Sequence, residues 1–248
     1  MIKVENLEKS FNGKKVLESV NLEFEQGKAN LIIGQSGSGK TVLLKSIVGL
    51  HPIDKGSVLY DGRDFHRLKK VKQKQVRREM GMLFQGSALF DSYTVADNVR
   101  FPLDIFTNQT KAEKMERVAF CLDRVNLKDV EDLLPSELSG GMKKRVAIAR
   151  AISMNPKYLF CDEPNSGLDP KTSVVIDELL LELTHEFNMT TIVNTHDLNS
   201  MMGIGENIIF IDNGKVAWTG NRDNLLETDN ETLRTFVYSS KILKDSSN

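Results

Sequence analysis

The sequence is poor in cysteine, histidine and tryptophan, and each shortage excludes a class of site. Its 248 residues include two cysteines, four histidines and one tryptophan. Cys121 and Cys161 are too few for a disulfide framework and do not form a CxxC pair, which excludes a secreted disulfide scaffold. The histidines are scattered and lack the spacing of metal ligands; they are His51, His66, His185 and His196.

Long apolar runs and an excess of one charge are also missing. The formal net charge is -1, and the contents of 40% hydrophobic and 27% charged residues are ordinary for a globular protein. No run approaches the roughly 20 apolar residues of a membrane helix, and the charged N-terminus does not resemble a signal peptide. We therefore expect a cytosolic protein with room for one large domain or two small ones, and no nucleic-acid partner.

One basic cluster stands out from this neutral balance, in residues 63–78 (RDFHRLKKVKQKQVRR). Such a run usually forms the solvated face of a helix, and we expect that here. Contact with anionic lipid or with a partner is the alternative.

Strand and helix patterns alternate along most of the chain. The first sixty residues are rich in β patterns, and residues 20–25 (VNLEFE) alternate apolar and polar side chains. From about residue 86 to residue 156 the pattern becomes helical, and Thr110 and Glu113 predict a capping box there. Alternating strands and helices predict a largely parallel sheet that is covered on both faces.

The later part of the chain adds further elements to this sheet. Pro170 sits where a helix begins, and Asn213-Gly214 predicts a tight hairpin between two strands. We expect one domain over residues 1–220, with a helical subdomain at about 86–156. Residues 221–248 are polar, with one weak helical stretch, and are predicted to form a tail or a docking arm.

A phosphate-binding motif lies between a buried strand pattern and an amphipathic helix pattern. Its glycines let consecutive backbone N–H groups point at phosphate oxygens, and the following helix adds the positive end of its dipole. We expect Lys40 to reach the β- and γ-phosphates and the Thr41 hydroxyl to coordinate Mg²⁺. The motif G-x-x-x-x-G-K-[ST] is formed by Gly34, Gln35, Ser36, Gly37, Ser38, Gly39, Lys40 and Thr41.

Polar residues follow three other apolar strand patterns. Asp162 and Glu163 end the strand YLFC, where the first acid can hold Mg²⁺ and the second can orient and polarise the attacking water. His196 follows the strand TTIVNT, and strand ends that converge at one sheet edge form a ligand crevice. His196 is therefore predicted to contact the γ-phosphate. Gln85 follows GMLF and is uninformative by itself.

A second helix start is rich in glycine and bears no charge. Ser139 is a good N-cap, and Gly140 and Gly141 leave the first N–H groups uncovered, which suits an anion that approaches end-on. Because the phosphate loop already encloses its own phosphates, this helix would be most useful against the nucleotide of a different chain. The alternative is a flexible loop that enters a surface helix.

Taken in order, GQSGSGKT, Gln85, LSGGM, YLFCDEP, SGLD and His196 resemble the ABC-type ATPase domain over essentially the whole chain. The resemblance implies an α/β P-loop NTPase core with a mainly parallel sheet, an N-terminal antiparallel β subdomain and an inserted α-helical subdomain. It further implies ATP and Mg²⁺ as ligands, and a homodimer in which two ATP molecules lie between the P-loop of one copy and the LSGG segment of the other.

The resemblance also implies roles for single residues. Ser139, Gly140 and Gly141 would contact the partner's γ-phosphate, Glu163 would be the catalytic base, and Asp162 the Mg²⁺-linked acid. His196 would be the switch residue, and Lys40 would act on the phosphates. Gln85 would be the sensor that connects the bound nucleotide to transmembrane permease subunits. Together with Thr41, it would also contribute to the metal site. Asp169 would shape the dimer seam, and Phe11 would stack on adenine.

One departure bears on the subfamily. The usual glutamine after LSGG is Met142 here, and LSGGM together with LFQGSALFDSYTVADNVRFPL is similar to the Mla/Mce group of ATPases. That similarity implies phospholipid or other lipid transport at the inner membrane, with the chain peripheral on the cytoplasmic face and an Mce-domain substrate-binding protein as a further partner. Leu89, Phe90 and Tyr93 would then form part of a docking surface, or else pack between core and helical subdomain.

Other functions remain as alternatives. Another ABC importer or exporter would share every motif named above. A soluble ABC-type machine on DNA or ribosomes is disfavoured, because no sustained heptads separate the P-loop from the signature and the chain has one such domain. A P-loop kinase or GTPase would leave LSGG unexplained.

Overall fold

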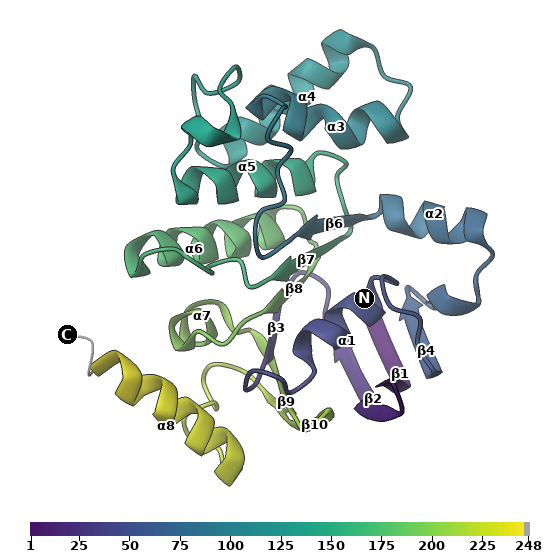
Figure 1. Ribbon diagram of the computed structural model, residues 1–248, viewed down its shortest axis with the longest axis vertical. Coiled ribbons are helices and arrows are strands. Elements are labelled where there is room, and N and C mark those ends of the chain that lie inside the picture. The colour runs from purple at the N-terminus through teal and green to yellow at the C-terminus, as the bar shows by residue number, and fades with distance from the viewer. Residues whose placement is uncertain (246–248) are drawn as a thin grey trace.

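The computed structural model describes the backbone of residues 1–245 and the side chains of residues 1–238. Two sheets and a set of helices build the molecule (Figure 1). The smaller sheet is antiparallel, with the strand order β2-β1-β4-β5. Its strands are β1 (Ile2–Phe11), β2 (Lys14–Phe24), β4 (Lys55–Tyr60) and β5 (Arg63–Asp64).

The larger sheet has six strands in the order β10-β9-β3-β8-β7-β6. Its pairs are parallel except for the hairpin of β9 and β10. Every residue of β3, β7 and β8 is buried, as expected for parallel strands covered on both faces. The strands are β3 (Ala29–Ile33), β6 (Met80–Leu83), β7 (Tyr158–Asp162), β8 (Thr190–Asn194), β9 (Asn207–Asp212) and β10 (Lys215–Gly220).

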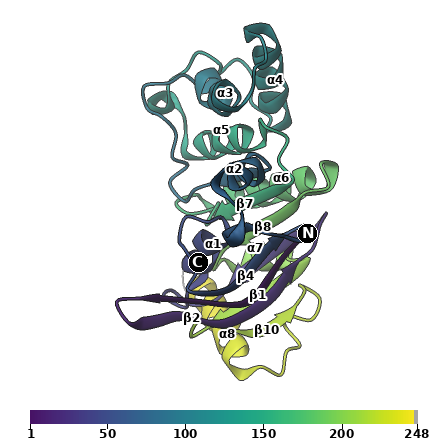
Figure 2. The same ribbon diagram turned by 90° about the vertical axis from the view of Figure 1, so that its right-hand side faces the viewer.

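Helices cover the larger sheet and form a separate group at one end. Figures 1 and 2 show α3, α4 and α5 stacked together at the opposite end of the molecule from β1 and β2. Two 3₁₀ turns span Phe65–Arg67 and Pro135–Glu137. The helices are α1 (Lys40–Ile47), α2 (Lys70–Arg78), α3 (Val95–Phe106), α4 (Lys111–Arg124), α5 (Gly140–Ile152), α6 (Pro170–Glu186), α7 (Leu198–Ile204) and α8 (Glu231–Asp245).

The larger sheet separates two apolar cores. On β3, Ala29, Leu31 and Ile33 pack into the core shared with the helical subdomain and α6. Ile32 points to the other side, into the core shared with α1 and the antiparallel sheet. Because alternate side chains of a strand lie on opposite faces, one buried strand serves both cores. The α/β fold with an antiparallel N-terminal sheet and a mainly parallel core is confirmed.

Several local predictions are also confirmed. Thr110 and Glu113 form the reciprocal capping box of α4, and Pro170 is the first residue of α6. Asn213 and Gly214 have φ angles of 47° and 75°, which suits the tight hairpin between β9 and β10. The second part of the basic cluster forms α2, where Val76 is the buried residue and the remaining side chains face solvent or its margin, as predicted. The first part, residues 63–67, instead forms β5 and a 3₁₀ turn in which Phe65 is buried.

The described part of the C-terminal extension packs against the domain and does not form a free tail. Leu225, Leu233, Phe236 and Val237 are buried in the same core as the central strands. The Phe236 ring lies 5.6 Å from the ring of Phe210 on β9. Apolar residues spaced along α8 therefore dock it on the domain, a pattern that its polar composition concealed.

Candidate nucleotide-binding site

The carboxyl ends of three parallel strands bring the predicted site residues together. Asn194 at the end of β8 pairs in register with Ile32 on β3 and with Asp162 on β7. The P-loop follows β3, Glu163 follows β7 and His196 follows β8, so they share one sheet edge. A cavity of about 730 Å³ opens there; its lining includes Gly34, Gln35, Ser36, Gly37, Gly39, Lys40, Thr41, Gln85, Glu163 and His196.

The P-loop backbone requires glycine at its tightest points. Gly34 has a φ angle of 148°, and a Cβ atom there would lie 2.3 Å from the carbonyl oxygen of Ile211. Gly39 is the N-cap of α1, with a left-handed φ of 109° and no side-chain cap. The first N–H groups of α1 are therefore left for another acceptor, as an anion-binding helix start needs.

Lys40 folds back into the loop that precedes it. Its Nζ donates hydrogen bonds to the carbonyl oxygens of Gly34 (2.8 Å) and Gln35 (2.9 Å). Burial lowers the pKa of Lys40, and the charges of Glu163 and Asp162 oppose that shift. An ammonium group has three donors, so a third remains for a phosphate oxygen.

Asp162 and Thr41 are joined by a residue that the sequence analysis missed. The Nδ2 atom of Asn194 donates to Asp162 Oδ1 (2.8 Å) and to Thr41 Oγ1 (3.3 Å). The signal was an asparagine within the β-branched strand TTIVN, where a buried apolar residue would be ordinary.

The donor set fits Mg²⁺ in kind. A hydroxyl and a carboxylate oxygen are the hard ligands that Mg²⁺ prefers, with substrate phosphates and water completing its coordination. Among the residues whose side chains are described, no group of three or more His, Cys, Asp or Glu residues could hold a metal by itself. Thr41 and Asp162 would therefore hold the ion together with a nucleotide.

Glu163 occupies a strained backbone position at the centre of the site. Its φ angle is 48°, in the left-handed region that non-glycine residues rarely adopt. Its N–H donates to the carbonyl oxygen of Asn194 (2.9 Å). Its carboxylate accepts a hydrogen bond from Gln85 Nε2 (3.1 Å) and lies 3.2 Å from His196 Nδ1. Strain that is held by such contacts is typical of functional sites.

Gln85 is held on both its backbone and its side chain. Its side-chain nitrogen also lies within 3.4 Å of Ser166 Oγ, and its carbonyl oxygen accepts a hydrogen bond from the buried Lys144 of α5. Burial lowers the pKa of Lys144. The sequence analysis missed Lys144 because it stands in a run of three basic residues that looks solvent-exposed. The role of Gln85 in a metal set remains a prediction.

The signature segment lies outside the cavity. Ser139 caps α5 by accepting a hydrogen bond from the Met142 N–H (3.2 Å), and Gly140 beside it is exposed. A Cβ atom at Gly141 would lie 2.8 Å from Thr172 Cγ2 on α6. Asp169 caps α6 by accepting from the N–H groups of residues 171 and 172. The helix start is thus a surface feature beside the start of α6.

Phe11 is also separate from the cavity lining. It ends β1, is 40% exposed and meets His51 edge-on at 5.3 Å between ring centroids. Val16 of β2 lines the cavity instead. Stacking of Phe11 on adenine remains a prediction.

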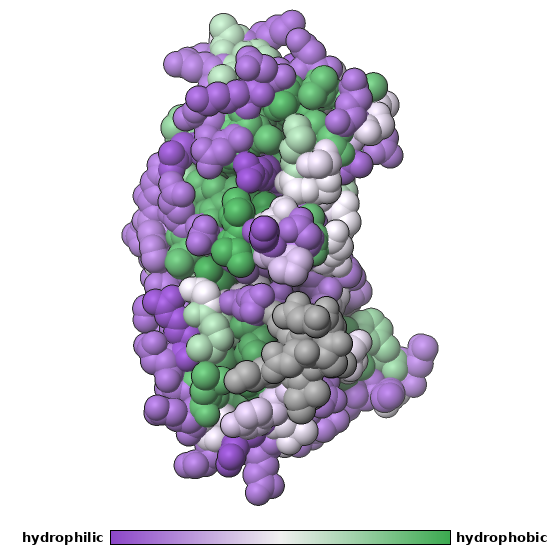
Figure 3. Space-filling model, turned by 90° about the vertical axis from the view of Figure 1, so that its left-hand side faces the viewer, coloured by the Kyte–Doolittle hydropathy of each residue, from purple (hydrophilic) through white to green (hydrophobic). Residues whose placement is uncertain are grey.

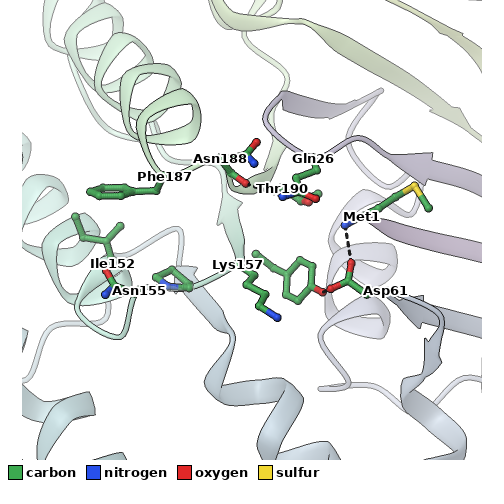
Figure 4. Close-up of a pocket in the computed structure, with 11 residues that line it drawn as sticks. Met1, Gln26, Asp61, Ile152, Asn155, Lys157, Phe187, Asn188 and Thr190 are labelled. Carbon is green, nitrogen blue, oxygen red and sulfur yellow. Dashed lines mark hydrogen bonds and ion pairs between the residues drawn. The ribbon is translucent and has the colours of Figure 1, made fainter.

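A second cavity lies at the opposite edge of the larger sheet (Figure 4). Its volume is about 530 Å³, and it contains the ion pair between the N-terminal amine of Met1 and Asp61 (2.9 Å). Lys157 and Thr190 place it at the beginnings of β7 and β8. Since ligands of open α/β sheets bind outside the carboxyl ends of the strands, the P-loop cavity is the candidate site.

Known proteins resemble this chain over nearly its whole length. The family described as ABC transporter matches residues 17–166. Methionine import ATP-binding protein MetN of Clostridium acetobutylicum is 38% identical over 237 residues, which are 96% of this chain and 74% of that protein. The protein named "Probable ribonucleotide transport ATP-binding protein mkl" of Mycobacterium leprae is 34% identical over 241 residues, 97% of this chain and 70% of that protein.

Solved structures agree with the fold. The dimeric structure of MJ0796, described as a bacterial ABC transporter cassette, has a TM-score of 0.81 and 33% identity, covering 90% of this chain and 99% of that one. A post-hydrolysis state of MJ0796 bound to ADP and Pi matches equally well. CbiO1 of Clostridium perfringens, part of the cbiONQ transporter complex, has a TM-score of 0.84 and 28% identity, covering 99% and 98%.

Proposed function

Because the chain belongs to the ABC transporter family and is an ATPase subunit of that family, we propose that it works as a head-to-tail dimer. Each ATP would lie between the P-loop of one copy and the start of α5 of the other. The observation that carries this proposal is that Ser139, Gly140 and Gly141 lie outside their own chain's cavity. Their uncovered N–H groups suit a γ-phosphate brought by a second copy. The solved structure of MJ0796 is described as dimeric, which supports the pairing of two copies.

The face that carries the sheet's carboxyl edge suits contact with a second copy. Figure 3 views the side toward which α6 and α7 project in Figure 1, and hydrophobic residues gather along its middle between hydrophilic margins. Val174 and Val175 on α6 are 42% and 41% exposed, and Met202 on α7 is 38% exposed. Exposed apolar surface with a polar rim is typical of an interaction site.

The site residues support in-line hydrolysis of the γ-phosphate. Glu163 would accept a proton from a water molecule whose oxygen attacks the γ-phosphorus, while the bond to the bridging oxygen breaks and ADP leaves. His196 and Gln85, which already contact the Glu163 carboxylate, would hold it toward that water. Lys40 would neutralise charge on the phosphate oxygens. Thr41 and Asp162 would hold Mg²⁺, which when bound offsets negative charge on the phosphates.

A groove beside Gln85 suits the docking of permease subunits. It has a volume of about 410 Å³ and lies between β6, α3 and α5. Phe84, Phe90 and Phe106 line it and are 38%, 40% and 42% exposed. Leu89, in contrast, packs against the core. Phe90 and Tyr93, each 40% exposed, are thus accessible as a docking surface requires, whereas Leu89 fits the alternative of ordinary packing. In the described part of the chain, no helix is long and apolar enough to cross a bilayer. Membership in the ABC transporter family supports a place at the cytoplasmic face of the membrane, with permease subunits as partners.

We propose phospholipid or other lipid transport as the work of the complex, with an Mce-domain binding protein as its partner. The support is the LSGGM signature and the sequence around Gln85. Met142 itself is partly buried and packs against the core. The 38% identity to MetN favours amino-acid import as the second candidate. The complex purified with its own permease and reconstituted in liposomes should show phospholipid-stimulated ATPase activity; stimulation by methionine and a binding protein alone would support the second candidate.

A mixed-chain experiment tests the shared site. Ser139→Arg blocks the start of α5, and Lys40→Ala disables the P-loop, so each variant alone should be inactive. Mixed dimers combine one doubly defective site with one intact site, and we expect mixing to restore part of the ATPase activity. If mixing restores none while both chains still pair in size-exclusion chromatography, each site is complete within one chain and the proposal is wrong.

A further inference from the structure

The last residue of β8 is polar, buried and placed between two predicted Mg²⁺ ligands. Asn194 is 0% exposed and pairs in register with Asp162 on the neighbouring strand. We propose that Asn194 is a positioning residue that holds Thr41 and Asp162 in the geometry that binds Mg²⁺. This inference rests on the nucleotide site proposed above.

Both described side-chain hydrogen bonds of Asn194 go to these two residues. Its Nδ2 atom donates to Asp162 Oδ1 at 2.8 Å and to Thr41 Oγ1 at 3.3 Å. A carboxylate can only accept hydrogen bonds, so the amide nitrogen rather than the amide oxygen must face Asp162. The orientation of the asparagine is therefore determined by its partner.

The asparagine is unfavourable for the core in which it lies. Its Oδ1 atom is buried and has no hydrogen-bond partner among the described residues, which carries a desolvation penalty. The preceding residues of β8, Ile192 and Val193, are apolar and fully buried, and a third such side chain would avoid the penalty. The hydrogen bonds that its amide nitrogen donates to Asp162 and Thr41, rather than core packing, therefore explain the asparagine at this position.

The two bonds leave each acceptor free to coordinate an ion. Asp162 keeps its second carboxylate oxygen, and the Thr41 hydroxyl keeps a second lone pair. Without the amide, both side chains could rotate away from the orientation that a hard cation needs. Loss of such an orienting partner typically weakens metal binding by about tenfold to hundredfold.

Asn194→Val tests this role, because it places a β-branched residue, which suits a buried strand, at this position and removes the donor. Mn²⁺ is the probe, and the EPR signal of free Mn²⁺ reports its binding to the protein–ADP complex. We expect Asn194→Val to weaken Mn²⁺ binding by about tenfold to hundredfold. The affinity for ADP in EDTA should be unchanged, since Asn194 does not line the cavity.

Thr191→Val is the matched control. Thr191 is equally buried in β8, and its hydroxyl lies 2.7 Å from Thr184 Oγ1, away from the site. The Thr191→Val variant should unfold at a lower temperature than wild type but keep wild-type Mn²⁺ affinity.

The outcomes separate this inference from the function on which it rests. Wild-type Mn²⁺ affinity in Asn194→Val would overturn the positioning role. A wild-type chain that binds no ADP would overturn the nucleotide site and the positioning role together. If Asn194→Val does not fold, Asn194→Ser provides the same test with a shorter side chain: weaker Mn²⁺ binding supports the role, and unchanged binding refutes it.

Discussion

Replacing Asp177 by asparagine should remove a specific pH dependence of folding. Asp177 lies buried on α6, where its two carboxylate oxygens accept hydrogen bonds from Asn165 Nδ2 (2.8 Å) and Ser200 Oγ (2.7 Å). Burial raises the pKa of Asp177 from its ordinary value of 3.8 to about 6, although both hydrogen bonds oppose the shift. Asn165 follows Glu163 in the loop after β7, so the carboxylate ties that loop to α6 and α7.

The magnitude follows from the two pKa values. Because the folded state binds the proton more tightly than the unfolded chain, the group's contribution to stability is largest at low pH and is lost as pH rises through about 6. With pKa values of about 6 and 3.8, lowering the pH from 8 to 5 should add about 1.4 kcal/mol to the free energy of unfolding through this group alone.

Urea unfolding of wild type and Asp177→Asn at pH 5 and pH 8 measures this difference. The free energy of unfolding of wild type relative to the variant should rise by about 1.4 kcal/mol from pH 8 to pH 5, while contributions from other groups cancel. Glu178→Gln, which removes the adjacent exposed carboxylate, serves as the control. An identical pH dependence in wild type and Asp177→Asn would refute the reasoning.

Three further predictions test the site and its scaffold. Glu163→Gln should keep ATP binding but lower hydrolysis by about 10²–10⁴-fold, because an amide cannot accept the proton; brisk phosphate release would exclude Glu163 as the base. Gly34→Ala should weaken ATP binding by at least about tenfold (1.4 kcal/mol), since its Cβ would lie 2.3 Å from the Ile211 carbonyl oxygen; equilibrium dialysis showing wild-type affinity would contradict the glycine requirement. Thr110→Ala should cost about 1 kcal/mol in urea unfolding by removing the α4 cap and leave ATPase activity unchanged; an unaltered midpoint would show that the capping box contributes little.

Features that depend on neighbouring residues in the chain were predictable. The capping box of Thr110, the start of α6 at Pro170 and the hairpin at Asn213 each involve contacts within a few residues. The P-loop is of the same kind, because its glycines and the helix that follows form one continuous segment. Side chains that are adjacent in the sequence determine local geometry of this kind.

Features that depend on distant residues were missed or misjudged. Lys144 lies on a helix in a basic run, and its burial against the Gln85 carbonyl becomes visible once α5 packs beside β6. Leu225 and Phe236 lie in a segment that the sequence predicted to be a tail or a docking arm, yet they complete the core over β9. In both cases the partner is many residues away, so no periodicity signals the contact.

By itself, the sequence determined that this chain binds a nucleotide phosphate, that strands alternate with helices, and where α1, α4, α5 and α6 begin, because these properties arise from residues that are neighbours along the backbone. The tertiary structure alone decided that Asn194 bridges Thr41 and Asp162, that Gln85 and His196 meet at Glu163, and that the start of α5 lies outside its own cavity. Those relations come from the order in which parallel strands pair, which brings separate strand ends to one edge.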